Sequence, residues 1–216
     1  MENLTCLYYT ANKENEDFEK KVQKNLLKNC GDIPIVSVSQ KPINLGYNIC
    51  VGEHGNSYIN EYRQILTGLK EIKTEYFISC EADFLYPPDY FTFKPNGADI
   101  YRSDNVWIVK KYYNKKAYSE GAQIAKTKYM IDFIEGYLEG LPLWFDGRPD
   151  ETMPFYDTYI KHQKELWRLP FTFFGCLPCL SFKTGNGVRK ATEVEQHRVR
   201  ELPYWGEIIS LKEKYL

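Results

Sequence analysis

The stretch YFISCEADFLYPPDYF, residues 76 to 91, limits the possible folds more than any other part of the chain. Residues 76 to 78 are aromatic or β-branched, which suits a short strand in a pleated, buried sheet. The apolar run ends in the acidic segment 81 to 83, and Pro87 and Pro88 then prevent the strand from continuing. We therefore predict a buried strand whose carboxyl end carries two acids.

Glu81 and Asp83 are two residues apart, so their side chains point to the same side of an extended chain. The carboxyl end of an open α/β sheet is where such folds bind their ligands. Two carboxylates there suit Mg²⁺ or Mn²⁺, which completes its coordination shell with substrate phosphates. The motif indicates a site for a metal and a diphosphate, although isolated acids after a strand are more often solvated turn residues.

The composition favours one globular domain over residues 1 to 216. With 43% hydrophobic and 26% charged residues, the chain is long enough to bury a core and needs no second folding unit. Its 28 basic and 29 acidic residues give no general signal for nucleic acid or membrane binding. The 18 Tyr, 12 Phe and 4 Trp belong to the core or form a platform for a sugar or a base.

The N-terminus and the cysteines predict a soluble, cytoplasmic protein with reduced thiols. The first ten residues lack the features of a signal peptide. The longest apolar run, residues 171 to 182, is shorter than the ~20 residues that a membrane helix needs. The six cysteines are irregularly spaced in a chain too large to need disulfides. Cys176 and Cys179 form a lone C-x-x-C motif without the second pair of a structural zinc site.

Strand and helix patterns alternate in the first half of the chain. We expect strands at residues 4–9, 33–38 and 76–78, helices over residues 18–26 and 57–69, and a loop at residues 43–56. Ser57 is the expected N-cap of the second helix. This order predicts a parallel sheet flanked by helices, with a nucleotide-binding half over residues 1 to 95.

The second half, residues 96 to 216, is less regular and is the expected acceptor side. We predict strands at residues 100–111, 118–126 and 171–182, a helix capped by Thr127, a loop at residues 141–154 and a closing helix at residues 202–216. The fold class is therefore α/β, with a Rossmann-like mixed sheet.

Several blocks of sequence carry a resemblance to a known family. They are LYYTAN at 7–12, PIVSVSQKPINLGYNICVG at 34–52, CEADFLYPPDYFTFKP at 80–95, DNVWIV at 104–109 and CLSFKTGNG at 179–187. In this order and spacing they resemble the small GT-A-type glycosyltransferases of the nucleotide-diphospho-sugar transferase superfamily, especially a compact bacterial and viral group. The resemblance implies a GT-A-like fold and transfer of a hexose or pentose from a nucleotide sugar.

The resemblance also implies roles for individual residues near the nucleotide. Thr10 and Asn12 match positions that approach the base and ribose, and otherwise serve as turn and capping residues. Asn60, Arg63 and Gln64, on the helix before the acidic motif, face the nucleotide or the diphosphate in this interpretation and are solvated in the alternative one.

Glu81 and Asp83 match the family's acidic metal motif, with Asp83 as the direct ligand. Two departures from the family pattern weaken the site: Ala82 replaces a His between the two acids, and residues 183–185 read Lys-Thr-Gly where the family has Arg-His-Gly. His197 is a substitute ligand or a surface residue.

Basic side chains offer an alternative to the metal. If the metal contribution is reduced, the charge of the diphosphate is neutralised by Lys183, Arg189 or Lys190.

The chemistry of sugar transfer calls for stabilisation of the departing nucleoside diphosphate by metal or by Lys and Arg. An inverting enzyme also needs a carboxylate base near the acceptor hydroxyl. Asp146, Asp150 and Glu151, in the acidic loop after Trp144, are the candidates, and a solvated loop is the alternative.

The sequence leaves the acceptor and the oligomeric state open. A glycan is the first hypothesis, and a hydroxymethylated pyrimidine in viral DNA, contacted by the basic segments 183–190 and 197–200, is the second. A non-catalytic module that binds sugar or nucleotide is the third, favoured by the missing His residues.

Overall fold

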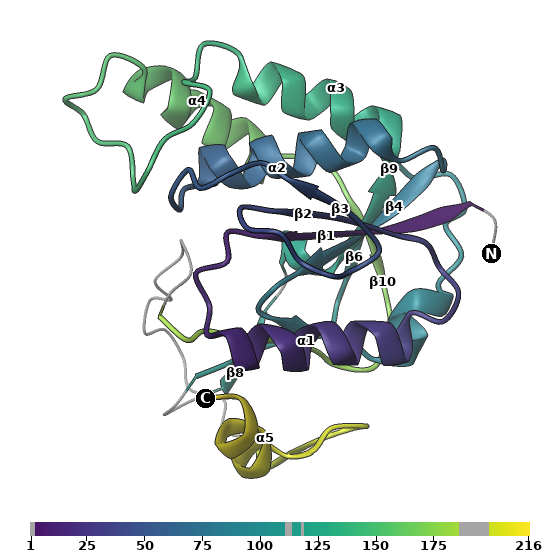
Figure 1. Ribbon diagram of the computed structural model, residues 1–216. Coiled ribbons are helices and arrows are strands. Elements are labelled where there is room, and N and C mark those ends of the chain that lie inside the picture. Colours follow the sequence, from purple (N-terminus) through teal and green to yellow (C-terminus); the bar gives the residue numbers. More distant parts are fainter. Residues whose placement is uncertain (1–2, 111–113, 118, 186–198) are drawn as a thin grey trace.

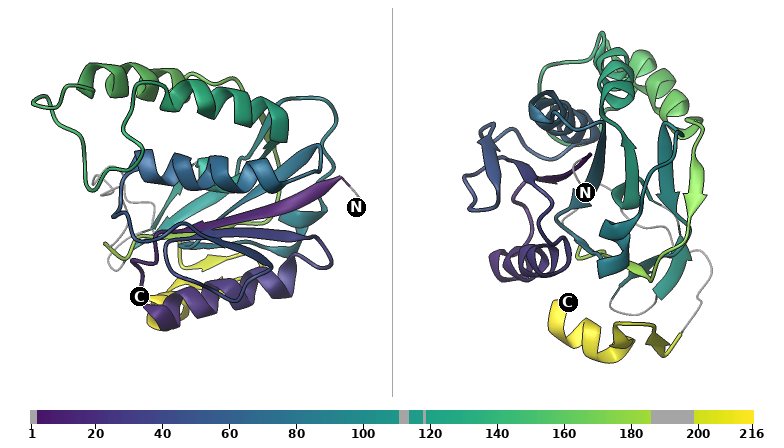
Figure 2. Two further views of the ribbon diagram at one scale, coloured as in Figure 1. Left: turned by 45° about the horizontal axis from the view of Figure 1, so that its top comes forward. Right: turned by 90° about the vertical axis from the view of Figure 1, so that its right-hand side faces the viewer.

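The computed structural model describes residues 3–110, 114–117, 119–185 and 199–216. A seven-stranded sheet runs through the middle, with α2, α3 and α4 on one face and α1 on the other (Figure 1). A smaller four-stranded sheet packs on the α1 side, and Figure 2 shows the same layers from two further directions. The protein is thus a mixed α/β fold with a mostly parallel central sheet flanked by helices.

The central sheet has the strand order β10-β6-β9-β4-β1-β2-β3. Its strands, in chain order, are β1 (Leu4–Thr10), β2 (Ile35–Ser39), β3 (Tyr47–Cys50), β4 (Tyr76–Glu81), β6 (Ile100–Ser103), β9 (Gln123–Lys126) and β10 (Thr172–Phe174). The strands β1, β2, β3 and β4 are parallel to one another, as the alternation of strands and helices predicts. β9 is antiparallel to both β4 and β6, so the two halves of the chain meet in one sheet.

The helices over the central sheet form for local reasons that the sequence shows. They are α1 (Glu16–Asn29), α2 (Tyr58–Glu71), α3 (Thr127–Leu138) and α4 (Tyr156–Trp167). Asn15 caps α1 by accepting from two backbone N–H groups, and Ser57 caps α2 by accepting from Asn60 N. α1 covers the helix predicted over residues 18–26 and buries Phe18, Val22 and Leu26, which lie four residues apart on one face.

The second sheet has the order β5-β11-β7-β8, with β5 (Phe84–Leu85), β7 (Val106–Val109), β8 (Asn114–Ala117) and β11 (Cys179–Phe182). β5 and β11 are antiparallel, and Ser181 lies opposite Phe84. The backbone N–H of Phe182 then donates to the carbonyl of Asp83 over 2.8 Å. This register places the end of β11 beside the acidic motif.

The remaining elements are two short 3-10 helices, η1 (Pro88–Thr92) and η2 (Glu120–Ala122), a small hairpin of β12 (Glu201–Leu202) and β13 (Gly206–Glu207), and α5 (Ile208–Tyr215). α5 packs its buried residues Ile208 and Leu211 into the core that contains α1. None of the described helices is both long and apolar enough to cross a membrane.

Several predicted boundaries are wrong. The predicted loop at residues 43–56 contains β3, which extends the central sheet by pairing with β2. The predicted strand at residues 100–111 divides into β6 and β7 of different sheets. The strand at 171–182 divides in the same way into β10 and β11, and the strand at 118–126 is reduced to β9 after the 3-10 turn η2.

Two helical predictions also need correction, and one helix is new. Thr127 is the first residue of α3 rather than its cap, because its hydroxyl donates to Thr74 O at 2.8 Å. The closing helix begins at Ile208, after the small hairpin. α4 was not predicted, because its buried face includes the polar residues His162 and Gln163.

The close packing of α2 on the sheet predicts opposite outcomes for two helical glycines. A Cβ on Gly68 would collide with Leu7 Cδ1 and lie 2.9 Å from Val38 Cγ2, so Gly68→Ala should lower the free energy of unfolding by about 1–3 kcal/mol. A Cβ on Gly136 in α3 meets no atom within 4 Å, so Gly136→Ala should raise it by about 0.5–1 kcal/mol. Urea unfolding of both variants checks this, and equal effects would contradict the packing.

Candidate active site

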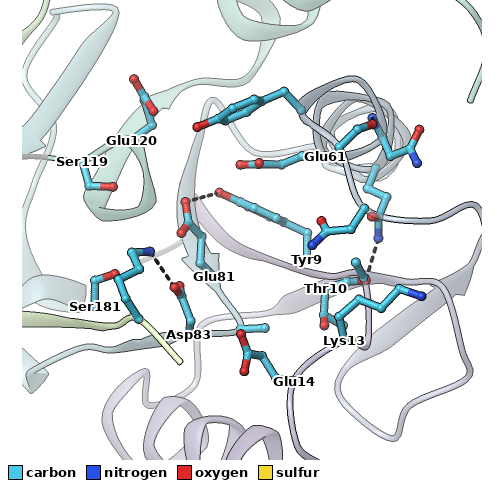
Figure 3. Close-up of a pocket in the computed structure, with 18 of the residues that line it drawn as sticks. Tyr9, Thr10, Lys13, Glu14, Glu61, Glu81, Asp83, Ser119, Glu120 and Ser181 are labelled. Carbon is cyan, nitrogen blue, oxygen red and sulfur yellow. Dashed lines mark hydrogen bonds and ion pairs between the residues drawn. The ribbon is translucent and has the colours of Figure 1, made fainter. Parts of the chain in front are cut away.

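A pocket of about 180 Å³ opens where β1 and β4 end, at the carboxyl edge of the parallel strands. Figure 3 shows carboxylate and hydroxyl side chains that line it from several elements. The lining residues are Tyr9, Thr10, Ala11, Lys13, Glu14, Gly55, Asn56, Ser57, Tyr58, Asn60, Glu61, Gln64, Glu81, Ala82, Asp83, Ile108, Ser119, Glu120, Ser181 and Lys183. The structure thus brings together six of the residues singled out from the sequence, namely Thr10, Asn60, Gln64, Glu81, Asp83 and Lys183.

Glu81 is the last residue of β4, and parallel pairing places it directly beside Tyr9 of β1. Its Oε1 accepts from the Tyr9 hydroxyl at 3.1 Å (Figure 3). A Cβ on Gly121 would lie 2.6 Å from the same carboxylate oxygen, so the backbone of η2 approaches Glu81 closely. Burial, and then the charge of Asp83, raise the pKa of Glu81 well above its usual range.

Tyr86 fixes the backbone around Glu81. Its hydroxyl accepts from Glu81 N at 2.9 Å and donates to Gly121 O at 2.6 Å, and the side chain is buried. The end of β4 and the turn η2 are therefore held together by one side chain.

Asp83 forms an ion pair with Lys183, whose Nζ lies 2.6 Å from Asp83 Oδ2. Both side chains are largely buried, at 15% and 19% exposure. Burial alone would lower the pKa of Lys183, but the charges of Asp83 and Glu81 outweigh it and raise that pKa. The acidic motif is thus partly neutralised by a lysine of the neighbouring strand.

The described residues form no ready-made metal site, and the expected direct ligand is already ion-paired. No three His, Cys, Asp or Glu side chains among them are grouped so as to hold a metal ion. Asp83, the expected direct ligand, has an ammonium group at hydrogen-bond distance, and Ala82 supplies no ligand atom. The third expected ligand, His197, lies outside the described residues, as do Arg189 and Lys190.

The loop after β1 is held by a buried carboxylate of α1. The hydroxyl of Thr10 donates to Glu19 Oε1 at 2.8 Å and accepts from Asn12 N at 2.9 Å. Asn12 has a positive φ of 51° and accepts from Lys41 N at 2.8 Å, so it shapes the loop and is not among the pocket-lining residues. Thr10 lines the pocket beside it.

The three polar residues of α2 have different surroundings. Gln64 donates to Thr10 O at 2.8 Å, and Asn60 donates to His54 O at 2.7 Å and accepts from Phe145 N at 2.9 Å. Both therefore hold the loops that form the pocket. Arg63 is not a lining residue; its guanidinium donates to the carbonyls of Leu138, Leu141 and Pro142 at 3.2–3.4 Å and so connects α2 to the end of α3.

The three carboxylates predicted as bases are not among the lining residues. Asp146 accepts from Asn56 N at 2.9 Å and packs against Gly55, while Asp150 accepts from the backbone and hydroxyl of Thr152. Glu151 is exposed. Glu61 and Glu120 line the pocket instead.

Sequence reasoning missed several lining residues, among them Lys13, Glu14, Glu61, Ser119, Glu120 and Ser181. Lys13 and Glu14 directly follow the LYYTAN block, so the strand end itself was a signal for them. Glu120 and Ser181 reach the pocket only through pairing between distant strands, which no local pattern reports.

Comparisons with known proteins give neighbours in structure only. No protein-family model and no curated protein matches the chain. Among solved structures, it is similar to a glycosyltransferase involved in glycosylation of the major capsid of PBCV-1 (11% identity, 81% of each chain, TM-score 0.44). It is also similar to the inositol-1-phosphate CTP transferase of T. maritima (12% identity, 86% of this chain and 91% of that one, TM-score 0.46).

A third neighbour is the mannosyltransferase PcManGT of Pyrobaculum calidifontis, solved with GDP-Man and Mn²⁺ (15% identity, 85% of this chain, TM-score 0.47). The chain spans 58% of the length of that protein and 50% of another matching structure. The neighbours thus include both nucleotidyltransferases and glycosyltransferases.

Glu19→Gln should make the thermal stability less dependent on pH. Burial raises the pKa of Glu19, so the stability that this group contributes is complete below about pH 4.5 and is lost as the pH rises through the raised folded-state pKa. The wild-type melting temperature should therefore fall relative to that of Glu19→Gln as the pH rises above about 4.5. Calorimetry at constant ionic strength measures this, with the exposed Glu71→Gln as control. Parallel wild-type and Glu19→Gln profiles would contradict the prediction.

Proposed function

We propose that this protein is a glycosyltransferase that moves a sugar from a nucleoside-diphosphate sugar to a hydroxyl group of a glycan. The proposal rests above all on one pocket, at the carboxyl end of β1 and β4, which gathers residues that the family resemblance assigns to the donor. Ligands of open α/β sheets bind at this edge.

The charges of the pocket suggest how the donor is oriented. Lys13 and Lys183 are its lining cations, and they suit the two phosphates. Thr10, held by Glu19, lies at the end of β1, where the resemblance places the nucleoside. Glu61, Glu81 and Glu120 accept hydrogen bonds, which suits the hydroxyl groups of a sugar.

In the proposed reaction, the acceptor oxygen forms a bond to the anomeric carbon while the bond from that carbon to the phosphate oxygen breaks. The electron pair leaves with the nucleoside diphosphate, and the lysine charges stabilise the negative charge that develops on it. In this proposal the charge is balanced by lysines, because Asp83, the expected metal ligand, is paired with Lys183.

An inverting reaction needs a carboxylate that takes the proton of the acceptor hydroxyl, and we propose Glu120 for this role. Its side chain lines the pocket at 26% exposure, and its Oε1 lies 3.9 Å from Arg102. The buried Arg102 guanidinium lies over the ring of Phe171 at 4.5 Å and helps to orient Glu120. Asp146, Asp150 and Glu151 stay predictions for the acceptor side.

A nucleoside diphosphate should stabilise the folded protein. At ~100 times its dissociation constant a ligand adds about 2.7 kcal/mol, which for a chain of this size is roughly a 5–11 °C rise in melting temperature. Thermal shift with UDP, GDP, ADP, CDP and TDP, each with EDTA or Mn²⁺, identifies the nucleobase that the protein prefers. Incubation with the matching nucleotide sugars should then release nucleoside diphosphate. The absence of any shift and any release would refute the donor site, and a shift without release would favour a non-catalytic binding module.

Glu120→Gln should lower the rate of transfer by about 10²–10⁴-fold, since general-base catalysis typically contributes that much. Asp150→Asn, in the acidic loop outside the pocket lining, tests the competing candidate: if Glu120 is the base, this variant should keep the rate within about threefold of the wild type. Both rates are measured at saturating donor after the melting temperatures are shown to be similar. If Asp150→Asn lowers the rate and Glu120→Gln does not, the catalytic base lies in the acidic loop and not at Glu120.

A further inference from the structure

We propose that Ser181 and Lys183 together bind the diphosphate of the donor and take the place of a divalent cation, so that donor binding does not need a metal. This inference rests on the proposed function and specifies how its donor is held.

The two donors lie two residues apart at the end of β11. Ser181 belongs to β11, and Lys183 continues its ladder by donating its backbone N–H to Val109 O at 3.0 Å. Side chains two residues apart on an extended strand point to the same side. Both line the pocket, and Figure 3 shows Ser181 pointing into it beside Asp83, the partner of Lys183.

Ser181 has an unused polar group. Its residue is 1% exposed, and its Oγ has no hydrogen-bond partner among the described residues. A buried hydroxyl without a partner costs stability, so its presence at the pocket wall points to a ligand that supplies the partner. A phosphate oxygen is such an acceptor.

Lys183 is held in place but keeps capacity for a ligand. The ammonium group has three N–H donors, and the 2.6 Å bond to Asp83 uses one of them. Asp83 is itself fixed, because its carbonyl accepts from Phe182 N at 2.8 Å. Asp83 therefore orients the lysine toward the pocket instead of coordinating a cation.

The same geometry disfavours a metal on Asp83. A divalent cation at this carboxylate would lie within a few ångströms of the Lys183 charge, and like charges at that distance repel strongly in a partly buried site. Thr184, at the position where the resemblance predicts a His, donates its hydroxyl to Glu14 at 2.7–2.8 Å. Thr184 therefore does not supply the imidazole nitrogen that a metal-binding His would offer at this position.

The test is calorimetric titration of the nucleoside diphosphate found in the thermal-shift screen, in EDTA and in Mn²⁺. The wild-type dissociation constant should differ by less than about threefold between the two conditions. Lys183→Met should weaken binding in EDTA by at least about tenfold, the usual effect of losing a charged hydrogen bond. Mn²⁺ should restore part of that loss, because Asp83 is then available to the metal.

Ser181→Ala separates a ligand role from a structural one. It should weaken binding by about 3–10-fold, whereas the melting temperature should stay equal or rise, because the substitution removes a buried hydroxyl without a partner. Lys126→Ala is the matched control for Lys183→Met, since Lys126 forms an ion pair with Asp99 at 2.9 Å away from the pocket lining. It should change neither binding nor its response to Mn²⁺.

Direct titration of Mn²⁺ by electron paramagnetic resonance completes the test. Lys183→Met should bind Mn²⁺ at least about tenfold more tightly than the wild type. Tight binding of Mn²⁺ to the wild type, or loss of wild-type nucleotide binding in EDTA, would overturn the inference and leave the proposed function standing. If no nucleotide binds under any condition, the proposed function fails, and the Mn²⁺ titration still decides whether Asp83 is a metal ligand. The wild-type arms decide the question even if Lys183→Met does not fold.

Discussion

The burial of β1 is the constraint on which the rest of the fold depends. All seven residues of this strand are buried, and it pairs with β2 on one side and with β4 on the other. Alternate side chains enter different cores: Cys6 and Tyr8 pack on the α1 side, and Leu7 and Tyr9 on the α2 side. Because both faces are covered, the strand has one register, and that register sets Tyr9 beside Glu81.

Much of the first half could be predicted from sequence because its signals are local. The cap Ser57 and the buried positions of α1 and α2 follow from the local sequence pattern. The second half could not be read this way. An apolar run such as residues 100–109 looks like one strand, but the chain turns at Asp104 and continues in another sheet. α4 has no continuous apolar stripe, because its buried face carries His162 and Gln163. Both of these side chains form hydrogen bonds with Tyr137, a contact that no local pattern predicts.

The pocket residues also divide into those that a local sequence pattern predicts and those that only the folded chain brings together. Glu81 and Asp83 were found because a strand end is visible in sequence, and Lys183 was found only through a resemblance. Ser181 and Glu120 could not be predicted, because their positions depend on pairing between strands that are far apart in the chain, such as β5 with β11. The roles of Asn60 and Gln64 in holding loops likewise depend on carbonyl groups that only the folded chain presents.

The hydroxyl of Tyr86, which connects Glu81 N to Gly121 O, has a consequence for selectivity. It belongs to a stack of buried rings that includes Tyr90, whose own hydroxyl donates to Ser79 O and Gln123 O. The wall of the pocket is therefore stiff, since moving it requires breaking several buried hydrogen bonds together. Under the proposed function, such a wall would select by exclusion: a sugar with a bulkier or inverted substituent would collide with it, because the wall would not move to make room.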